Sequence, residues 1–227
     1  SIAVDVSVEN LKNLSCISGH KKLQRLDASV NNLTSLHELA TLNTLRELDI
    51  KDNRLTCLDG VEHLHKLRIL NADSNRLRDN DKGALAAIAD LPGLMVLSLA
   101  NNQLERLVSK EDSASFMSST LPTGLERLSL YHNRLTSIAP SCLYNLRHTL
   151  TYLDLGRNQL QFIDGNALSS CQLLTHVVLS QNKLTSVPTP LHLPMLQALW
   201  LSGNRLSDLL PWVSPRSDST SNSNSDD

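Results

Sequence analysis

The sequence predicts an α/β repeat solenoid whose short strands stack in parallel from one coil to the next. Three observations predict this fold. The pattern L-x-x-L-x-L-x-x-N-x-L occurs eight times along the 227 residues. Residues around its L-x-L segment alternate, as side chains do along a strand. Leu supplies about a fifth of the chain while aromatic residues make up only 3%, which indicates many similar small environments rather than one irregular interior.

The eight copies begin at residues 23, 45, 67, 94, 125, 150, 174 and 196, so they lie 22, 22, 27, 31, 25, 24 and 22 residues apart. All of them keep the asparagine of the pattern, at Asn31, Asn53, Asn75, Asn102, Asn133, Asn158, Asn182 and Asn204. An amide side chain both donates and accepts hydrogen bonds. We therefore expect an asparagine ladder that satisfies backbone groups of adjacent coils where the chain turns inward.

A weaker ninth unit precedes the first full copy. Val4 and Val6 lie 22 residues before Leu26 and Ala28, and Glu9 stands where the asparagine belongs. One repeat cannot bury its apolar face alone, so neighbouring repeats must supply the rest of the core. We expect this unit to form the N-terminal edge of the stack.

These repeats resemble the leucine-rich-repeat family over roughly residues 1–210. The resemblance implies a right-handed solenoid, with a curved parallel sheet on the concave face and helices or turns on the convex face. The 22-residue repeats, such as the one containing residues 33–42, resemble the short intracellular class. That class includes the regulatory subunit of protein phosphatase 1 and repeat proteins of axonemal dynein. The longer middle repeats depart from it.

The longer intervals and the C-terminus carry predictions of their own. Residues 79–81 (Asp-Asn-Asp) precede apolar residues at helical spacing, which predicts a true helix on the convex side over residues 84–91. The polar segment 109–115 predicts a projecting loop. We expect the repeat domain to span residues 1–213, with residues 211–213 covering the last coil. The Ser/Asn/Asp-rich residues 214–227 predict a disordered tail.

Composition and motifs argue against several functions. The net charge of −2 gives no electrostatic reason to expect nucleic acid, and no run of 18 apolar residues predicts a membrane span. Phosphate-binding glycine loops and the H-E-x-x-H motif are absent from the sequence. The scattered His residues show no ligand spacing. We expect no enzymatic activity, no metal and no cofactor.

The four cysteines suggest a compartment. Cys16, Cys57, Cys142 and Cys171 lie far apart, without a C-x-x-C pair or the clustered cysteines that seal the ends of extracellular solenoids. We therefore expect thiols in a reducing, cytoplasmic compartment, with association with the cytoskeleton as a further expectation from the resemblance.

The repeat frame also predicts which side chains line the concave face, namely those that flank the inward residues of each strand. The N-terminal half is acidic, with Asp52 beside the strand positions, and the C-terminal half holds three of the chain's seven aromatic residues. Tyr and Trp are frequent anchors of binding hot spots. The predicted partner-binding residues are Asp27, Glu47, Asp49, Asp73, Tyr131, His132, Tyr152, His176 and Trp200.

The leading hypothesis is a non-catalytic scaffold or regulatory module that binds a protein on its concave face. The resemblance implies a phosphatase catalytic subunit or a cytoskeletal or axonemal protein as partner. A second hypothesis is the recognition segment of a larger enzyme, such as a kinase, GTPase or ubiquitin ligase. A third, a receptor ectodomain, would need cysteine caps and a signal sequence.

Overall fold

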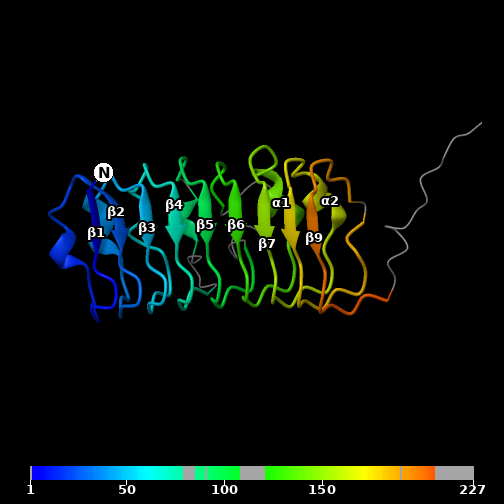
Figure 1. Cartoon of the computed structure of the whole chain (residues 1–227), viewed down its shortest axis with the longest axis horizontal. Coiled ribbons are helices and arrows are strands. Elements are labelled where there is room, and N and C mark those ends of the chain that lie inside the picture. Colours follow the sequence, from blue (N-terminus) through cyan, green and yellow to red (C-terminus); the bar gives the residue numbers. More distant parts are fainter. Residues whose placement is uncertain (1, 79–84, 90, 108–120, 190, 208–227) are drawn as a thin grey trace, which may run out of the picture.

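The molecule is a curved stack of coils whose strands form one parallel sheet. The structure, a computed structural model, describes residues 2–78, 85–89, 91–107, 121–189 and 191–207. In this part of the chain nine strands lie side by side in chain order (Figure 1). They are β1 (Ile2–Asp5), β2 (Leu23–Asp27), β3 (Glu47–Asp49), β4 (Ile69–Asn71), β5 (Val96–Ser98), β6 (Arg127–Ser129), β7 (Tyr152–Asp154), β8 (His176–Val178) and β9 (Ala198–Trp200).

The strands pair in the register that the sequence pattern predicts. Leu26 lies beside Leu48, Leu48 beside Leu70 and Leu70 beside Leu97, and the same repeat position stays aligned through to β9. Val4 of the degenerate first unit pairs with Leu26, so this unit begins the stack. The predicted solenoid fold is confirmed.

The convex side of each coil consists of short turns. In the second coil the Leu39, Leu42 and Leu45 amides donate to the carbonyl three residues earlier, at 2.8–3.0 Å. Residues three apart lie on the same face of a 3-10 helix, which has three residues per turn. The leucines, which recur every third residue here, therefore all point into the core. The described 3-10 helices are η1 (Ser15–Ile17), η2 (His37–Thr41) and η3 (Ala86–Ile88).

The predicted helix over residues 84–91 is described only as η3, a single 3-10 turn. Its apolar neighbours Leu85, Ile88 and Leu91 are buried and spaced by three, a period that suits the 3-10 form better than the α form. The proposed cap at residues 79–81 lies outside the described residues.

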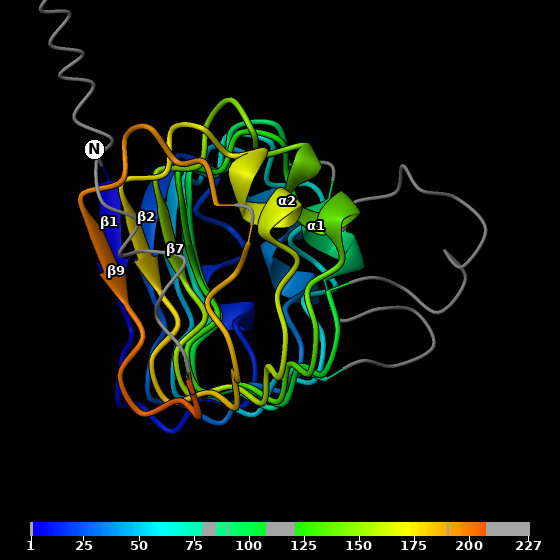
Figure 2. The same ribbon diagram turned by 90° about the vertical axis from the view of Figure 1, so that its right-hand side faces the viewer.

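Two repeats, of 25 and 24 residues instead of 22, contain short α-helices. They are α1 (Pro140–Tyr144) and α2 (Gly165–Ser169), which lie in contact on the convex side. Figure 2 shows both across the coil from the sheet. The Asp164 carboxylate caps α2 by accepting the Asn166 N–H at 2.9 Å, as expected at a helix N-terminus.

The core fills the space between the sheet and the convex turns. Inward strand residues such as Leu70 and convex-turn residues such as Leu64 are fully buried. Burying each such side chain contributes about 1.5–3 kcal/mol to the stability of the fold. Leu199 and Leu201 of the last described coil are only partly buried, because no later described coil covers them. Stability therefore depends on neighbouring coils, as in other solenoids.

The ladder asparagines join each coil to the one before it. The Asn53 Oδ1 accepts the Leu33 N–H at 2.9 Å, and Nδ2 donates to the Ala28 carbonyl at 3.0 Å, both in the preceding coil. The same Nδ2 lies 3.1 Å from the Ile50 carbonyl of its own coil. The seven ladder residues from Asn31 to Asn182 are buried, whereas Asn204 is half-buried in the last described coil.

A left-handed residue precedes every ladder asparagine. From Val30 to Gln181 the φ angles at this position lie between 51° and 57°. This backbone conformation turns the chain inward at the end of each strand. It is unfavourable for most L-residues, so the ladder hydrogen bonds must offset its cost.

Several predictions fall on residues that the structure does not describe. These are the loop at 109–115, the C-terminal cover at 211–213 and the tail at 214–227. Within the described ranges, no helix has the length and apolar character needed to span a bilayer.

Candidate functional site

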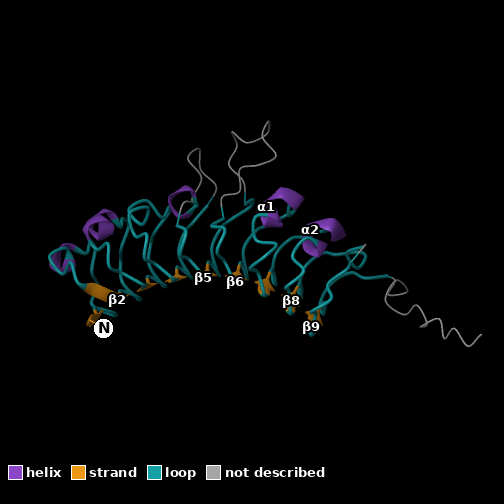
Figure 3. Ribbon diagram, turned by 90° about the horizontal axis from the view of Figure 1, so that it is seen from above, coloured by secondary structure: helices purple, strands orange, loops and turns teal. Residues whose placement is uncertain are grey.

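The strands lie along the inner side of the arc (Figure 3), so their outward side chains line this face. The strand register aligns them in two columns. The first column is Arg25, Glu47, Ile69, Val96, Arg127, Tyr152, His176 and Ala198. The second column is Asp5, Asp27, Asp49, Asn71, Ser98, Ser129, Asp154, Val178 and Trp200.

The structure places the predicted site residues in two separate groups. Asp27, Glu47 and Asp49 lie on β2 and β3, with Asp73 just after β4. Tyr152, His176 and Trp200 lie on β7, β8 and β9, and Tyr131 and His132 follow β6. We call the first group the acidic half. The remaining residues form the aromatic half of the concave face.

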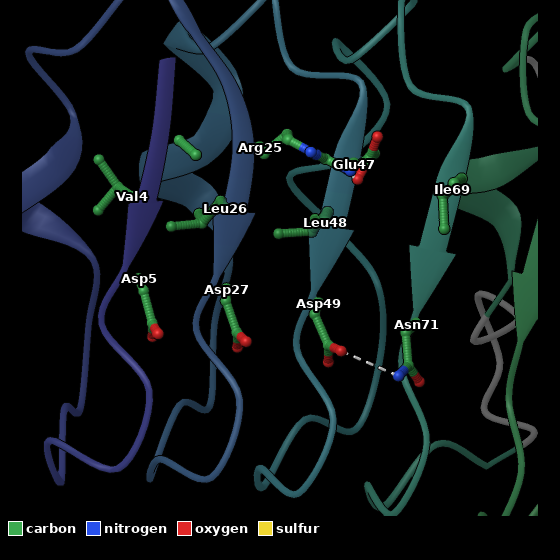
Figure 4. Close-up of a pocket in the computed structure, with 11 residues that line it drawn as sticks. Val4, Asp5, Arg25, Leu26, Asp27, Glu47, Leu48, Asp49, Ile69 and Asn71 are labelled. Carbon is green, nitrogen blue, oxygen red and sulfur yellow. Dashed lines mark hydrogen bonds and ion pairs between the residues drawn. The ribbon is translucent and has the colours of Figure 1, made fainter. Parts of the chain in front are cut away.

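In the acidic half, the carboxylates of the second column accept hydrogen bonds from the backbone and also line the concave surface. Asp27 Oδ1 accepts the Ser29 N–H at 2.9 Å, and Asp49 Oδ1 accepts the Lys51 N–H at 3.0 Å. Figure 4 shows Asp5, Asp27 and Asp49 in a row at the ends of their strands. Such Asx turns hold the chain where it leaves the strand, so part of this acidic pattern is structural.

Asp49 is the carboxyl of this row whose pKa is raised. It is half-buried, and desolvation by burial raises its pKa, with the charge of Asp27 adding to the rise. The Asn71 side chain donates to Asp49 Oδ2 at 3.1 Å, which partly offsets that cost. The row lines an open hollow of about 530 Å³ on the concave face, which Ile69 also lines.

The other two predicted acids are also engaged within the chain. Glu47 forms an ion pair with Arg25 at 2.6 Å. Asp73 Oδ1 accepts the Ser98 hydroxyl at 2.6 Å and the Ala100 N–H at 2.7 Å. Asp73 therefore links β4 to the next coil, a role that the sequence pattern did not predict.

The aromatic half contains a row of neighbouring rings, which we call the aromatic ladder: Tyr152, His176 and Trp200. The ring centroids of Tyr152 and His176 lie 6.3 Å apart, and those of His176 and Trp200 lie 5.8 Å apart with 24° between their planes. Trp200 remains 43% exposed. The rings thus form a continuous π surface across three strands.

Two arginines contact aromatic rings of this half, and sequence reasoning missed both as site residues. The Arg127 guanidinium lies 4.4 Å from the centroid of the Tyr152 ring, a cation–π contact. Arg157 lies 5.8 Å from the Tyr131 ring and donates from Nε to Gln181 Oε1. Arg127 precedes Tyr152 in the first column, so the strand register was the signal that could have found it.

Asp154 is the acid of the aromatic half. Its Oδ1 accepts the Gly156 N–H at 2.9 Å. Burial raises the pKa of Asp154, and burial together with the nearby Asp154 charge raises the pKa of Tyr152. The tyrosine hydroxyl therefore stays protonated and remains a hydrogen-bond donor near neutral pH.

Tyr131 and His132 form a second pair beside the ladder. Their ring centroids lie 6.0 Å apart in an edge-to-face arrangement. His132, which the repeat pattern predicts on the concave face, occupies the left-handed position after β6. Its Nδ1 lies 2.6 Å from Asn101 Oδ1.

Among the described residues, no three His, Cys, Asp or Glu side chains gather in a way that could hold a metal ion. No disulfide joins the four cysteines, all of which lie in described segments. Burial raises the pKa of the Cys142 and Cys171 thiols, which disfavours the reactive thiolate.

Comparison with known proteins agrees with the geometry. A family model described as leucine-rich repeat matches residues 123–184 and 148–206. The fold of the chain is that of a leucine-rich-repeat solenoid. The match does not distinguish the short intracellular class from other classes of this fold.

Curated relatives match about half of this solenoid. A leucine-rich repeat-containing G-protein coupled receptor 5 from Rattus norvegicus is 37% identical over 126 residues, which are 53% of this chain and 12% of the receptor. Keratocan from Danio rerio is 32% identical over 120 residues, 52% of this chain and 34% of keratocan. Nephrocan from Mus musculus is 31% identical over 120 residues, 52% of this chain and 21% of nephrocan. The matched region is thus at most about a third of each relative.

Solved structures share the fold over most of the chain. Internalin C2 from Listeria monocytogenes superposes with a TM-score of 0.70 at 23% identity, covering 88% of this solenoid and 80% of that structure. The functional domain of InlJ from the same organism has a TM-score of 0.60 at 26% identity, covering 91% of this chain and 45% of that one.

Proposed function

We propose that this solenoid is a non-catalytic scaffold or regulatory module that recognises a protein partner on the concave face of its sheet. Leucine-rich-repeat proteins generally act as protein-interaction modules. The aromatic ladder is the observation that carries the finer proposal. Large rings left partly exposed on a sheet are typical anchors of binding hot spots.

The rigidity of the sheet supports this function. The asparagine ladder and the strand pairing fix the backbone beneath Tyr152 and Trp200. Anchors that are already ordered lose little conformational entropy when a partner binds. The partners implied by the 22-residue repeats, a phosphatase catalytic subunit or a cytoskeletal protein in the cytoplasm, are the first to test within this proposal.

The test compares two double variants in affinity capture from the native cell followed by mass spectrometry. Tyr152→Ala with Trp200→Ala removes the two ends of the aromatic ladder. Tyr144→Ala with Phe162→Ala removes two rings that are 50% and 62% exposed but lie outside the sheet. We expect the natural partner to be lost with the first variant and retained with the second.

The affinity of the captured partner for each variant then measures how much binding is lost. Each buried anchor contributes roughly 2 kcal/mol or more, so the ladder variant should bind more than about a hundredfold more weakly. Equal capture by both variants, with the wild-type melting temperature preserved, would show that binding uses another surface.

A further inference from the structure

The charges of the concave face are distributed unevenly along its length. Carboxylates outnumber cations from β1 to β4, and Arg25 is already paired with Glu47 at 2.6 Å. Between β6 and β9 the cations Arg127 and Arg157 are exposed, and neither makes an ion pair with any described residue. The two ends of the same sheet therefore differ in electrostatic sign.

From this asymmetry, and resting on the proposed function, we infer that the partner segment bound at the aromatic ladder is acidic and lies over β6–β9, with its carboxylates on Arg127 and Arg157. The partner is a protein segment that alternates carboxylate side chains with aromatic or apolar ones. The ladder stacks against its rings, and the arginines pair with its acids.

The stacking of Arg127 suits it to this role. Its guanidinium lies over the Tyr152 ring at 4.4 Å. The ring interacts with the charge but supplies no carboxylate, so Arg127 keeps donors for a partner. A guanidinium can bind a carboxylate through two parallel N–H donors while stacked on a ring. Arg157 lies one repeat further along, beside the Tyr131 ring, and provides the second cation.

The groups around these arginines do not neutralise them. Asp154 is half-buried and already accepts the Gly156 N–H. Its neighbours in the second column are Ser129 and Val178, which carry no charge. A carboxylate arriving from a partner thus meets two exposed cations and one carboxylate that is partly withdrawn from the surface.

The acidic half fixes the position of such a segment. Asp27 and Asp49 lie in one row on adjacent strands, and like charges brought against them are repelled. An acidic segment that slides toward β2 and β3 loses its partners and gains this repulsion. The acidic half therefore acts as a boundary that confines the segment to β6–β9.

The experiment uses two labelled probe peptides of equal length, one repeating Glu-Tyr-Glu-Trp and the other repeating Lys-Tyr-Lys-Trp. Binding to the full chain is measured by fluorescence anisotropy at low and at physiological salt. We expect the glutamate probe to bind at least about tenfold tighter than the lysine probe, with the difference shrinking as salt screens it. Arg127→Glu with Arg157→Glu should abolish or reverse this preference.

Arg147→Glu is the matched control. Arg147 also lies over a tyrosine, 4.2 Å from the Tyr144 ring, but that pair belongs to the α1 region on the convex side. This variant should keep the preference for the glutamate probe.

Three results would overturn the inference: tighter binding of the lysine probe, no binding of either probe, or a glutamate preference that survives the double reversal. If Tyr152→Ala with Trp200→Ala weakens both probes while the double reversal changes nothing, concave binding stands and the acidic segment is wrong. If the ladder variant leaves the natural partner bound, the proposed function fails independently of these probes.

Discussion

At the scale of single residues, one side-chain amide forms hydrogen bonds with backbone groups of two coils. Asn102 Oδ1 accepts the Leu77 N–H at 3.0 Å, and its Nδ2 donates to the Ala72 carbonyl at 3.0 Å and to the Leu99 carbonyl at 3.0 Å. Leaving such buried backbone groups unsatisfied costs roughly 1–3 kcal/mol each. Asn102→Ala should therefore lower the free energy of unfolding by at least about that amount in urea titration.

Asn204→Ala is the internal control for that measurement. Asn204 makes equivalent bonds to Leu184 and Leu179, but it is only half-buried. Water can replace its hydrogen bonds, so the loss should be clearly smaller than for Asn102. Equal losses at both positions would contradict the account of the ladder.

The raised pKa of Asp49 predicts that the stability of the protein depends on pH. Its pKa is raised in the folded state, so the folded protein binds more protons than the unfolded chain in the acidic range. The contribution of this group to stability therefore falls as pH rises through that range. Asn71, one strand along, makes the same turn bond, accepting the Asp73 N–H at 3.1 Å. The melting temperature of Asp49→Asn relative to wild type should accordingly rise between pH about 4 and pH 7, because only the wild-type side chain loses a proton over that range.

Asp5→Asn tests the sign of this pH dependence. Asp5 lies in the same column and makes the same turn bond to Ser7 at 2.9 Å, but that backbone hydrogen bond lowers its pKa. Its substitution should give no such relative gain as pH rises. A relative gain with rising pH at Asp5, or a relative loss with rising pH at Asp49, would contradict the directions of these two pKa shifts.

At the scale of elements, the connection after the third strand depends on one glycine. Gly60 has a φ of 107°, and a Cβ there would overlap the carbonyl of Leu36 in the preceding coil. Gly60→Ala should destabilise the protein by roughly 1–3 kcal/mol through backbone strain alone, with the overlap adding to it. Gly19→Ala, where a Cβ meets nothing within 4 Å, should be close to neutral in the same thermal melts.

The elements differ in how well the sequence predicts them. The strands and their register follow from the constant spacing of leucines and asparagines, and this prediction is confirmed. The convex turn over residues 85–91 was harder, because apolar residues such as Leu85, Ile88 and Leu91 fit both the 3-10 and the α period over so short a run. Local hydrogen bonding decides between the two forms.

The candidate site shows the same limit. Periodicity places Asp73 and Tyr152 near the concave face, but it does not say which carboxylates bind their own backbone. Asp73 accepts two hydrogen bonds from the next coil, which depends on side-chain rotamers rather than on spacing. The Arg127–Tyr152 stack, in contrast, was available from the register of β6 and β7.

At the scale of the whole molecule, each coil contacts its neighbours and the sheet holds their side chains in fixed columns. The concave face therefore presents an extended surface whose properties change from acidic at β2 and β3 to aromatic and cationic between β6 and β9. A solenoid recognises its partner through many modest contacts along such a surface, with a few anchors supplying most of the affinity.

Site-specific photo-crosslinking tests the central claim most directly, since two tyrosines lie on opposite faces. A photoreactive benzoylphenylalanine replaces Tyr152 on β7 in one protein and Tyr144 on α1 in another. Each protein is irradiated with the partner captured from the native cell. We predict an adduct from position 152 and none from position 144. An adduct from position 144 alone would place the partner on the convex side and contradict the account.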